Sequence, residues 1–331
     1  MASSDFALWL AWRIAQGIDA GVGEWILVRD QAGHDMLLRE VATALAEAGA
    51  TPLIEIATPE WLARVLAHAP QEALMHFDQH RRIWLEQCHR IVTLDGGLLD
   101  AVQADEHRQA LWLEAQVRLI AIEESRHVPH LVVAVPTPSK AAQLGMTLEV
   151  LTSTLLDAQR ATLFDLERPM DRVLLKASEA QRLQVRFAED DALYLMRATT
   201  QWQRNDGYIE AEDVAQHNTL ATLPAGALST SLAPETAHGV LTVPNVGKLH
   251  FAEGHVVQVE SSELPAEMLL GAAPVALRLG LNPVLRQPLG WSWVDQLVHG
   301  AVTLDFGDHP LGEITLHGAA LWLEDWQAFG A

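Results

Sequence analysis

The sequence predicts two domains of different classes, an α/β domain with a parallel sheet over residues 1–165 and a β-rich domain over residues 166–331. In the first half, short apolar runs alternate with segments that repeat apolar residues at helical spacing, which is typical of parallel strands joined by crossover helices. In the second half, apolar and polar residues alternate, which is typical of antiparallel strands. A chain of 331 residues is long enough to bury more than one core.

The elements of the first domain follow from local signals. The first segment, around residues 6–14, fits an amphipathic helix, and Asp5 stands where a signal peptide would carry positive charge. Thr58 and Pro59 predict the start of a helix, and Gly49 predicts the end of another. The predicted strands are residues 25–29, 51–56, 90–94 and 130–135, and the predicted helices include residues 36–48 and 105–122.

The second domain begins with two alternating segments, residues 182–187 and 193–197, around an acidic turn that contains Asp190 and Asp191. Gly254 fits a hairpin turn between two later strands. Residues 264–270 are the best helical segment in this half. The further predicted strands are residues 239–243, 248–251, 255–260, 301–306 and 313–322.

Composition excludes some classes of partner. The formal net charge is −21, with 43 acidic against 22 basic residues, so nucleic acid is not expected, because phosphate binding needs clustered Lys and Arg. No apolar run approaches the ~20 residues that a membrane-spanning helix needs. Cys88 is the single cysteine, which rules out an internal disulfide. We expect a cytoplasmic protein that binds neither nucleic acid nor membrane.

Several motifs carry a resemblance. Residues 135–149, VPTPSKAAQLGMTLE, precede LPAGALSTSLAP (223–234), GHVV (254–257) and LGLNP (279–283). Together they resemble the aminopeptidase T family of metallopeptidases, whose members are typically longer. The resemblance implies an α/β N-terminal domain, a β-rich C-terminal metal domain and a homodimer.

The same resemblance equates five positions with metal ligands, namely Ala227, Ala276, Thr303, His317 and Ala319. Only His317 keeps a metal-binding side chain. A catalytic metal needs about three protein ligands in fixed geometry, and alanine offers no donor atom. We therefore expect neither a metal nor another cofactor, and no catalytic residue. His317 is a relic of the site.

The motifs of the family are present while the residues at its metal-ligand positions are not. This combination favours a pseudoenzyme that binds a peptide without cutting it. An extended peptide can add to a β-rich wall as an edge strand. Trp291 and Trp293 are expected on an extended segment, where alternate side chains face the same way and line one groove. The expected peptide contacts are Arg278, Arg286, Trp291, Trp293 and His317.

Site-lacking relatives of this family are similar to the precursor-binding proteins of ribosomal peptide biosynthesis, the crocagin type among them. That analogy suggests a precursor (leader) peptide as the partner. Two alternatives stay open. One is a metal-dependent enzyme with a rebuilt single-metal site around Asp305, His309 and His317. The other is an inactive dimer partner of an active paralogue.

Overall fold

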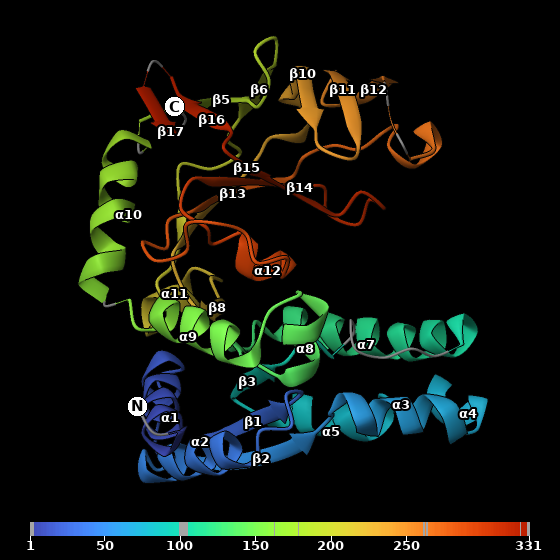
Figure 1. Cartoon of the computed structure of the whole chain (residues 1–331), viewed down its shortest axis with the longest axis vertical. Helices are drawn as coiled ribbons and strands as arrows, with labels where there is room; N and C mark the ends of the chain where they lie inside the picture. The colour runs from blue at the N-terminus through green and yellow to red at the C-terminus, as the bar shows by residue number, and fades with distance from the viewer. Residues whose placement is uncertain are drawn as a thin grey trace. The chain divides into compact units, whose positions relative to one another are not determined.

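The computed structural model describes residues 3–98, 105–161, 163–177, 179–260, 262, 264–324 and 326–329. The chain forms two compact units. Unit 1 contains Met1–Leu156 and Gly207–Leu223, and unit 2 contains Asp157–Asp206 and Pro224–Ala331. The chain first passes from unit 1 to unit 2 after Leu156, nine residues before the predicted domain boundary at 165. It returns to unit 1 for Gly207–Leu223 before it completes unit 2 (Figure 1).

Unit 1 is built on a parallel sheet with strand order β2-β1-β3-β4-β8, as the fold class predicted. Its central strands are apolar and buried, because helices pack beside a parallel sheet. The strands are β1 (Trp25–Asp30), β2 (Thr51–Ile56), β3 (Arg90–Asp95), β4 (His130–Ala134) and β8 (Leu220–Leu223). The helices are α1 (Ser3–Gly17), α2 (Asp35–Glu47), α3 (Pro59–His68), α4 (Gln71–Met75), α5 (Gln79–Gln87), α7 (Glu106–Arg126), α8 (Pro138–Gln143), α9 (Leu148–Gln159), which runs on into unit 2, and α11 (Ala211–Ala215).

The fifth strand, β8, was not predicted. It has only four residues and pairs in parallel with β4, with Leu131 opposite Ala221 and Val133 opposite Leu223. These pairs join segments about ninety positions apart in the sequence. The short stretch Gly207–Leu223 therefore supplies an edge of the first sheet from within the second half of the chain.

The motif that carries the resemblance most strongly has a structural role in unit 1. The Thr137 hydroxyl accepts a hydrogen bond from Lys140 N at 3.1 Å and donates one to Gly96 O at 3.2 Å. It thereby caps α8 and ties the helix to the end of β3. Thr147 caps α9 through Val150 N at 3.3 Å, and Gly145 adopts the left-handed backbone that ends α8.

Five charged or titratable side chains form a buried network on one face of the parallel sheet. Arg29 pairs with Glu55 at 3.4 Å and with Glu123 at 2.5 Å, and Arg81 pairs with Glu55 at 2.5 Å. Burial, aided by the charge of Arg29, lowers the pKa of His130 to about 3, so its ring is neutral. Two guanidinium groups thus balance two carboxylates inside unit 1, as buried charges require.

Unit 2 consists of two antiparallel sheets, as the alternating pattern predicted. The seven-stranded sheet has the order β12-β11-β10-β6-β5-β16-β17, and the five-stranded sheet has the order β15-β14-β13-β9-β7. The first contains β5 (Arg182–Arg186), β6 (Ala192–Met196), β10 (His238–Val243), β11 (Gly247–Ala252), β12 (His255–Glu260), β16 (Ala320–Leu323) and β17 (Trp326–Phe329). The second contains β7 (Gln203–Asn205), β9 (Ala227–Ser231), β13 (Ala276–Gly280), β14 (Ala301–Asp305) and β15 (Glu313–His317). The helical elements are α10 (Leu163–Ala177), α12 (Ser292–Asp295) and the short 3₁₀ turns η1 (Pro234–Thr236) and η2 (Ala266–Met268).

Two local predictions for unit 2 were wrong. The single strand predicted over residues 313–322 is two strands, β15 and β16, which belong to different sheets. Gly318, with φ of 86°, breaks the strand between them and lets the chain change sheets. The helix predicted over residues 264–270 is reduced to the three residues of η2.

In the part of the chain that the structure describes, no helix is both long enough and apolar enough to cross a membrane.

Candidate functional site

The five-stranded sheet of unit 2 has one polar face, defined by three rows of residues that lie opposite one another in its register. Opposite residues in antiparallel strands share a face, and side chains two positions apart along a strand share it too. The middle row is Thr315, Thr303, Arg278, Ser229 and Gln203. The flanking rows are Glu313, Asp305, Ala276 and Ser231 on one side and His317, Ala301, Gly280, Ala227 and Asn205 on the other.

Hydrogen bonds along the middle row agree with this register. Thr303 Oγ1 lies 3.0 Å from Thr315 Oγ1, and Ser229 Oγ donates to Gln203 Oε1 at 3.5 Å. The opposite face is apolar and buried, with Leu277, Leu279, Val302, Leu304 and Leu316 among its members. The sheet therefore places its polar residues together on one face, in which Thr303, Ala227 and Ala301 are themselves buried.

Four of the five positions that the resemblance equates with metal ligands, here called the ligand-equivalent positions, lie on this polar face. Ala227, Ala276, Thr303 and His317 come from strands β9, β13, β14 and β15. The fifth, Ala319, is buried just after β15. Positions far apart in the sequence thus converge on one surface, which is the arrangement that a shared site would need.

The side chains on this face do not fit a metal. Ala227 and Ala276 have no donor atom, and the Thr303 hydroxyl is engaged with Thr315. His317 offers one imidazole, and Nδ1 of that ring is buried without a hydrogen-bond partner among the described residues. Within the described ranges, no group of three or more His, Cys, Asp or Glu side chains could hold a metal ion.

Arg278 occupies the middle of the polar face. Its guanidinium donates to Gln296 Oε1 and to Glu313 Oε1, the latter at 3.3 Å, and Gln296 Nε2 donates to the second oxygen of the same carboxylate. These contacts hold a permanent positive charge between the positions of Ala276 and Ala227. A nearby cation disfavours a divalent metal by direct repulsion.

The rebuilt single-metal site requires Asp305 and His317 to meet. Asp305 lies opposite Glu313, whereas His317 lies opposite Ala301, so the two side chains are offset by four residues along the strands. At ~3.3 Å per residue this offset is about 13 Å. His309 is held elsewhere, since its Nδ1 accepts from Leu311 N at 3.2 Å. The register thus keeps Asp305 and His317 apart.

His317 is neutral in its surroundings. Burial lowers its pKa below the ordinary 6.5, and the negative charge of Asp295 opposes that effect. Asp295 is itself buried and accepts hydrogen bonds from Leu289 N at 2.6 Å and Gly290 N at 2.9 Å. The imidazole can therefore act as a neutral hydrogen-bonding group on the polar face.

The extended segment expected to carry Trp291 and Trp293 is not extended. Trp291 stands at the N-cap of the short helix α12, and its side chain is only 2% exposed. Its ring packs edge-on against that of Trp293, with centroids 6.0 Å apart. Because a helix begins at Ser292, the two rings do not line one groove side by side. Trp291 is a core residue, and Trp293 is partly exposed.

The LGLNP segment is held in place by buried hydrogen bonds. Asn282 of LGLNP is fully buried, and its Nδ2 donates to Ala225 O at 2.6 Å and to Ala158 O at 3.2 Å. Its Oδ1 accepts from Val284 N and Leu285 N. Gly226, with φ of 115°, packs so closely that a Cβ would lie 2.8 Å from the Asn282 backbone. These contacts give LGLNP and the loop around Gly226 a structural role in unit 2.

Arg286, the remaining predicted contact, lies in the exposed loop after LGLNP. Its charge contributes to a lowered pKa at His299, although burial is the larger cause. Two further arginines near His299, Arg168 and Arg172, were not predicted. Their four-residue spacing on α10 was visible in the sequence, but nothing local tied them to His299.

The chain joins a parallel-sheet α/β unit to a unit of antiparallel sheets. The structure is similar to that of wild-type AmpT from Thermus thermophilus, with a TM-score of 0.68 and 14% sequence identity over 97% of this chain and 95% of that chain. No family model matches the sequence, and neither does any curated protein. At 14% identity the likeness shows the fold.

Proposed function

We propose that this protein binds a peptide without cutting it, on an aminopeptidase T-like fold. The polar face is the observation that supports this proposal most directly. Four of the ligand-equivalent positions lie on this face. Two of them are alanines, and Arg278 lies between them. A surface of this kind can hold a polar ligand, and no group of three or more metal-ligating side chains lies there among the described residues.

Strand β15 offers the place for the peptide. It is an edge of the five-stranded sheet and pairs only with β14 among the described strands. An edge strand presents unpaired backbone groups to which an extended peptide can add. A peptide bound there would run beside Glu313, Thr315 and His317, where a carboxylate, a hydroxyl and a neutral imidazole can pair with its side chains.

The proposed partner is a precursor (leader) peptide of ribosomal natural-product biosynthesis, bound in the cytoplasm by a homodimer. This part rests on the analogy with site-lacking relatives. In that setting the protein holds the precursor and regulates the modifying enzymes, so the peptide must remain uncut.

Calorimetric titration with precursor peptides encoded beside the gene tests the proposal, followed by mass spectrometry of the recovered peptide. We expect binding in the micromolar range and an unchanged peptide mass. His317→Ala should weaken binding severalfold, and His309→Ala serves as the matched control off the polar face. Shortened peptide that depends on added zinc or cobalt would instead support the metalloenzyme. Absence of binding to every such peptide would favour the inactive dimer partner.

A further inference from the structure

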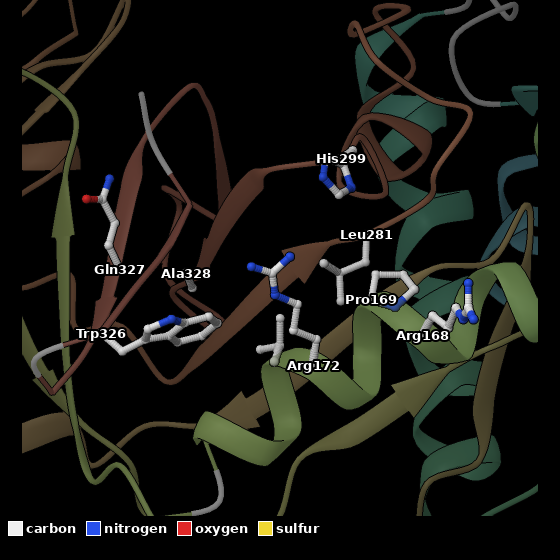
Figure 2. Close-up of a pocket in the computed structure, with 9 residues that line it drawn as sticks. Arg168, Pro169, Arg172, Leu281, His299, Trp326, Gln327 and Ala328 are labelled. Carbon is white, nitrogen blue, oxygen red and sulfur yellow. The ribbon is translucent and has the colours of Figure 1, made fainter.

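Unit 2 contains a cavity of about 380 Å³ that is separate from the polar face. Helix α10 forms one wall with Arg168 and Arg172, and β17 contributes Trp326. Leu281, directly after β13, and His299, two residues before β14, complete it. In Figure 2, Arg172 extends from α10 so that its guanidinium lies between Trp326 and His299. The volume falls in the range of small-ligand sites.

The two arginines carry charge that no acid neutralises. Their spacing of four residues places them on one face of α10, where like charges repel. Among the described residues neither has an ion-pair partner. Asp171, the acid beside Arg172, pairs with Arg204 at 2.6 Å instead. Arg168 stacks over the Phe164 ring at 4.4 Å. Unpaired guanidinium groups at a cavity wall are the expected device for binding an anion.

The surroundings strengthen this positive region. Arg286 lies near enough to His299 to lower its pKa, together with the larger effect of burial, so the imidazole stays neutral and can accept or donate a hydrogen bond. The whole chain has a net charge of −21. Arg168 and Arg172, which have no ion-pair partner among the described residues, therefore mark a local attraction for negative charge.

The other walls are apolar. Trp326 and Leu281 stand beside the arginines, together with Pro169, Val173 and Ala328. A phosphate group would gain nothing from such walls, whereas a carboxylate attached to an apolar side chain would bury that side chain against them. The planar guanidinium also matches the two oxygens of a carboxylate.

We propose that this cavity binds a carboxylate-bearing residue of the peptide, with Arg172 pairing to the carboxylate and Trp326 and Leu281 contacting the apolar part. The occupant rests on the proposed function, but the chemistry of the cavity can be tested without the natural peptide. The carboxylate can come from the C-terminus of the peptide or from an acidic side chain, since both present the same group.

The first test uses N-acetylleucine and its uncharged counterpart N-acetylleucinamide in saturation-transfer NMR with the full chain. We expect N-acetylleucine to bind in the millimolar range and the amide at least about fivefold more weakly. Arg172→Gln should raise the dissociation constant of N-acetylleucine about tenfold, since a charge-assisted pair is lost. Arg182→Gln, an exposed arginine on β5, is the matched control and should change nothing.

Three results would overturn the proposal: no saturation transfer to N-acetylleucine, equal binding of acid and amide, or unchanged binding by Arg172→Gln. Inorganic phosphate is added as a competitor at the same concentration. Displacement of N-acetylleucine by phosphate would show a general anion site and would also overturn the carboxylate assignment.

The second test separates the two sources of the carboxylate and isolates this proposal from the proposed function. A precursor peptide that binds the wild type is compared with its C-terminal amide and with versions in which Glu or Asp is replaced by Gln or Asn. A tenfold loss with the amide assigns the terminus, and a loss with a side-chain replacement assigns that residue. If the peptide binds wild type and Arg172→Gln equally, this inference fails while peptide binding stands. If N-acetylleucine binds but no peptide does, the proposed function fails alone.

Discussion

Arg278 lies directly opposite Thr303 in the antiparallel register of β13 and β14. A guanidinium therefore adjoins the position that the resemblance assigns to a metal-binding histidine. Its contacts with Glu313 and Gln296 hold it there without a ligand. Arg278, rather than a metal ion, supplies the positive charge at this face.

Loss of the contacts of Arg278 with Glu313 and Gln296 should lower the free energy of unfolding by a small but measurable amount. Arg278→Met removes the charge and leaves Glu313 and the buried Gln296 short of a partner. Since the arginine side chain is 31% exposed and the glutamate 41%, screening limits their pairwise coupling to about 1 kcal/mol or less. A double-mutant cycle with Glu313→Gln in urea measures it. Coupling well above that value would contradict the partly solvated arrangement.

Added zinc should not stabilise the protein. A metal that binds only the folded chain raises the free energy of unfolding by about 2.7 kcal/mol at a hundredfold excess over its dissociation constant. Within the described ranges no group of three or more His, Cys, Asp or Glu side chains could hold a metal ion, so we expect a melting temperature unchanged by about 100 µM Zn²⁺ relative to EDTA. A rise in melting temperature that disappears in His317→Ala would revive the metalloenzyme.

Asn282 should be among the most sensitive positions of unit 2. Asn282→Ala leaves two buried carbonyls and two backbone N–H groups without their side-chain partner. We expect a loss of about 3 kcal/mol or more in the free energy of unfolding. Val284→Ala, at an exposed neighbouring position, is the control and should cost much less. Similar losses for both variants would show that the hydrogen bonds of Asn282 are unimportant.

Protonation of His130 should contribute to acid unfolding. Its Nε2 lies 2.8 Å from Thr93 Oγ1, and its Nδ1 lies 3.5 Å from a Glu123 carboxylate that already pairs with Arg29. That carboxylate would favour the protonated ring, but burial and the charge of Arg29 prevail, and the folded pKa is about 3. The unfolded chain, with a pKa near 6.5, takes up the proton first as pH falls. Stability is therefore full above pH 6.5 and decreases from there toward pH 3.

The size of that effect has an upper limit of about 5 kcal/mol, because each pKa unit corresponds to about 1.36 kcal/mol. The ring is still 20% exposed, so the loss should be smaller. Urea unfolding between pH 7 and pH 4 should show a shallower pH dependence for His130→Asn than for the wild type. His107→Asn, at an exposed histidine on α7, should keep the wild-type slope. Equal slopes for all three proteins would mean that folding does not lower the pKa of His130.

The sequence was sufficient for the fold class and for most strands, because β1, β3 and β4 each contain a short run of buried apolar residues, which is a local signal. It was insufficient for β8, which is four residues long and finds its partner about ninety positions earlier. The Trp291 segment was misread because five residues cannot separate a two-residue period from the start of a helix.

The sequence also predicted only part of the candidate sites. The ligand-equivalent positions were found through a resemblance, and their convergence on one face became visible only through the register of four strands. The cavity beside α10 was missed because Arg172 and Trp326 are 154 positions apart, and no local pattern joins them. Both sites form through contacts between residues far apart in the sequence, and local sequence patterns do not predict such contacts.

The excursion of Gly207–Leu223 into unit 1 has a consequence for synthesis on the ribosome. When the first 156 residues have emerged, β4 still lacks its neighbour, and its open edge stays available to other chains until residue 223 has left the exit tunnel. By then part of unit 2 has been translated as well. A fragment that ends at residue 156 is therefore expected to aggregate when expressed alone, and the two units should be produced together.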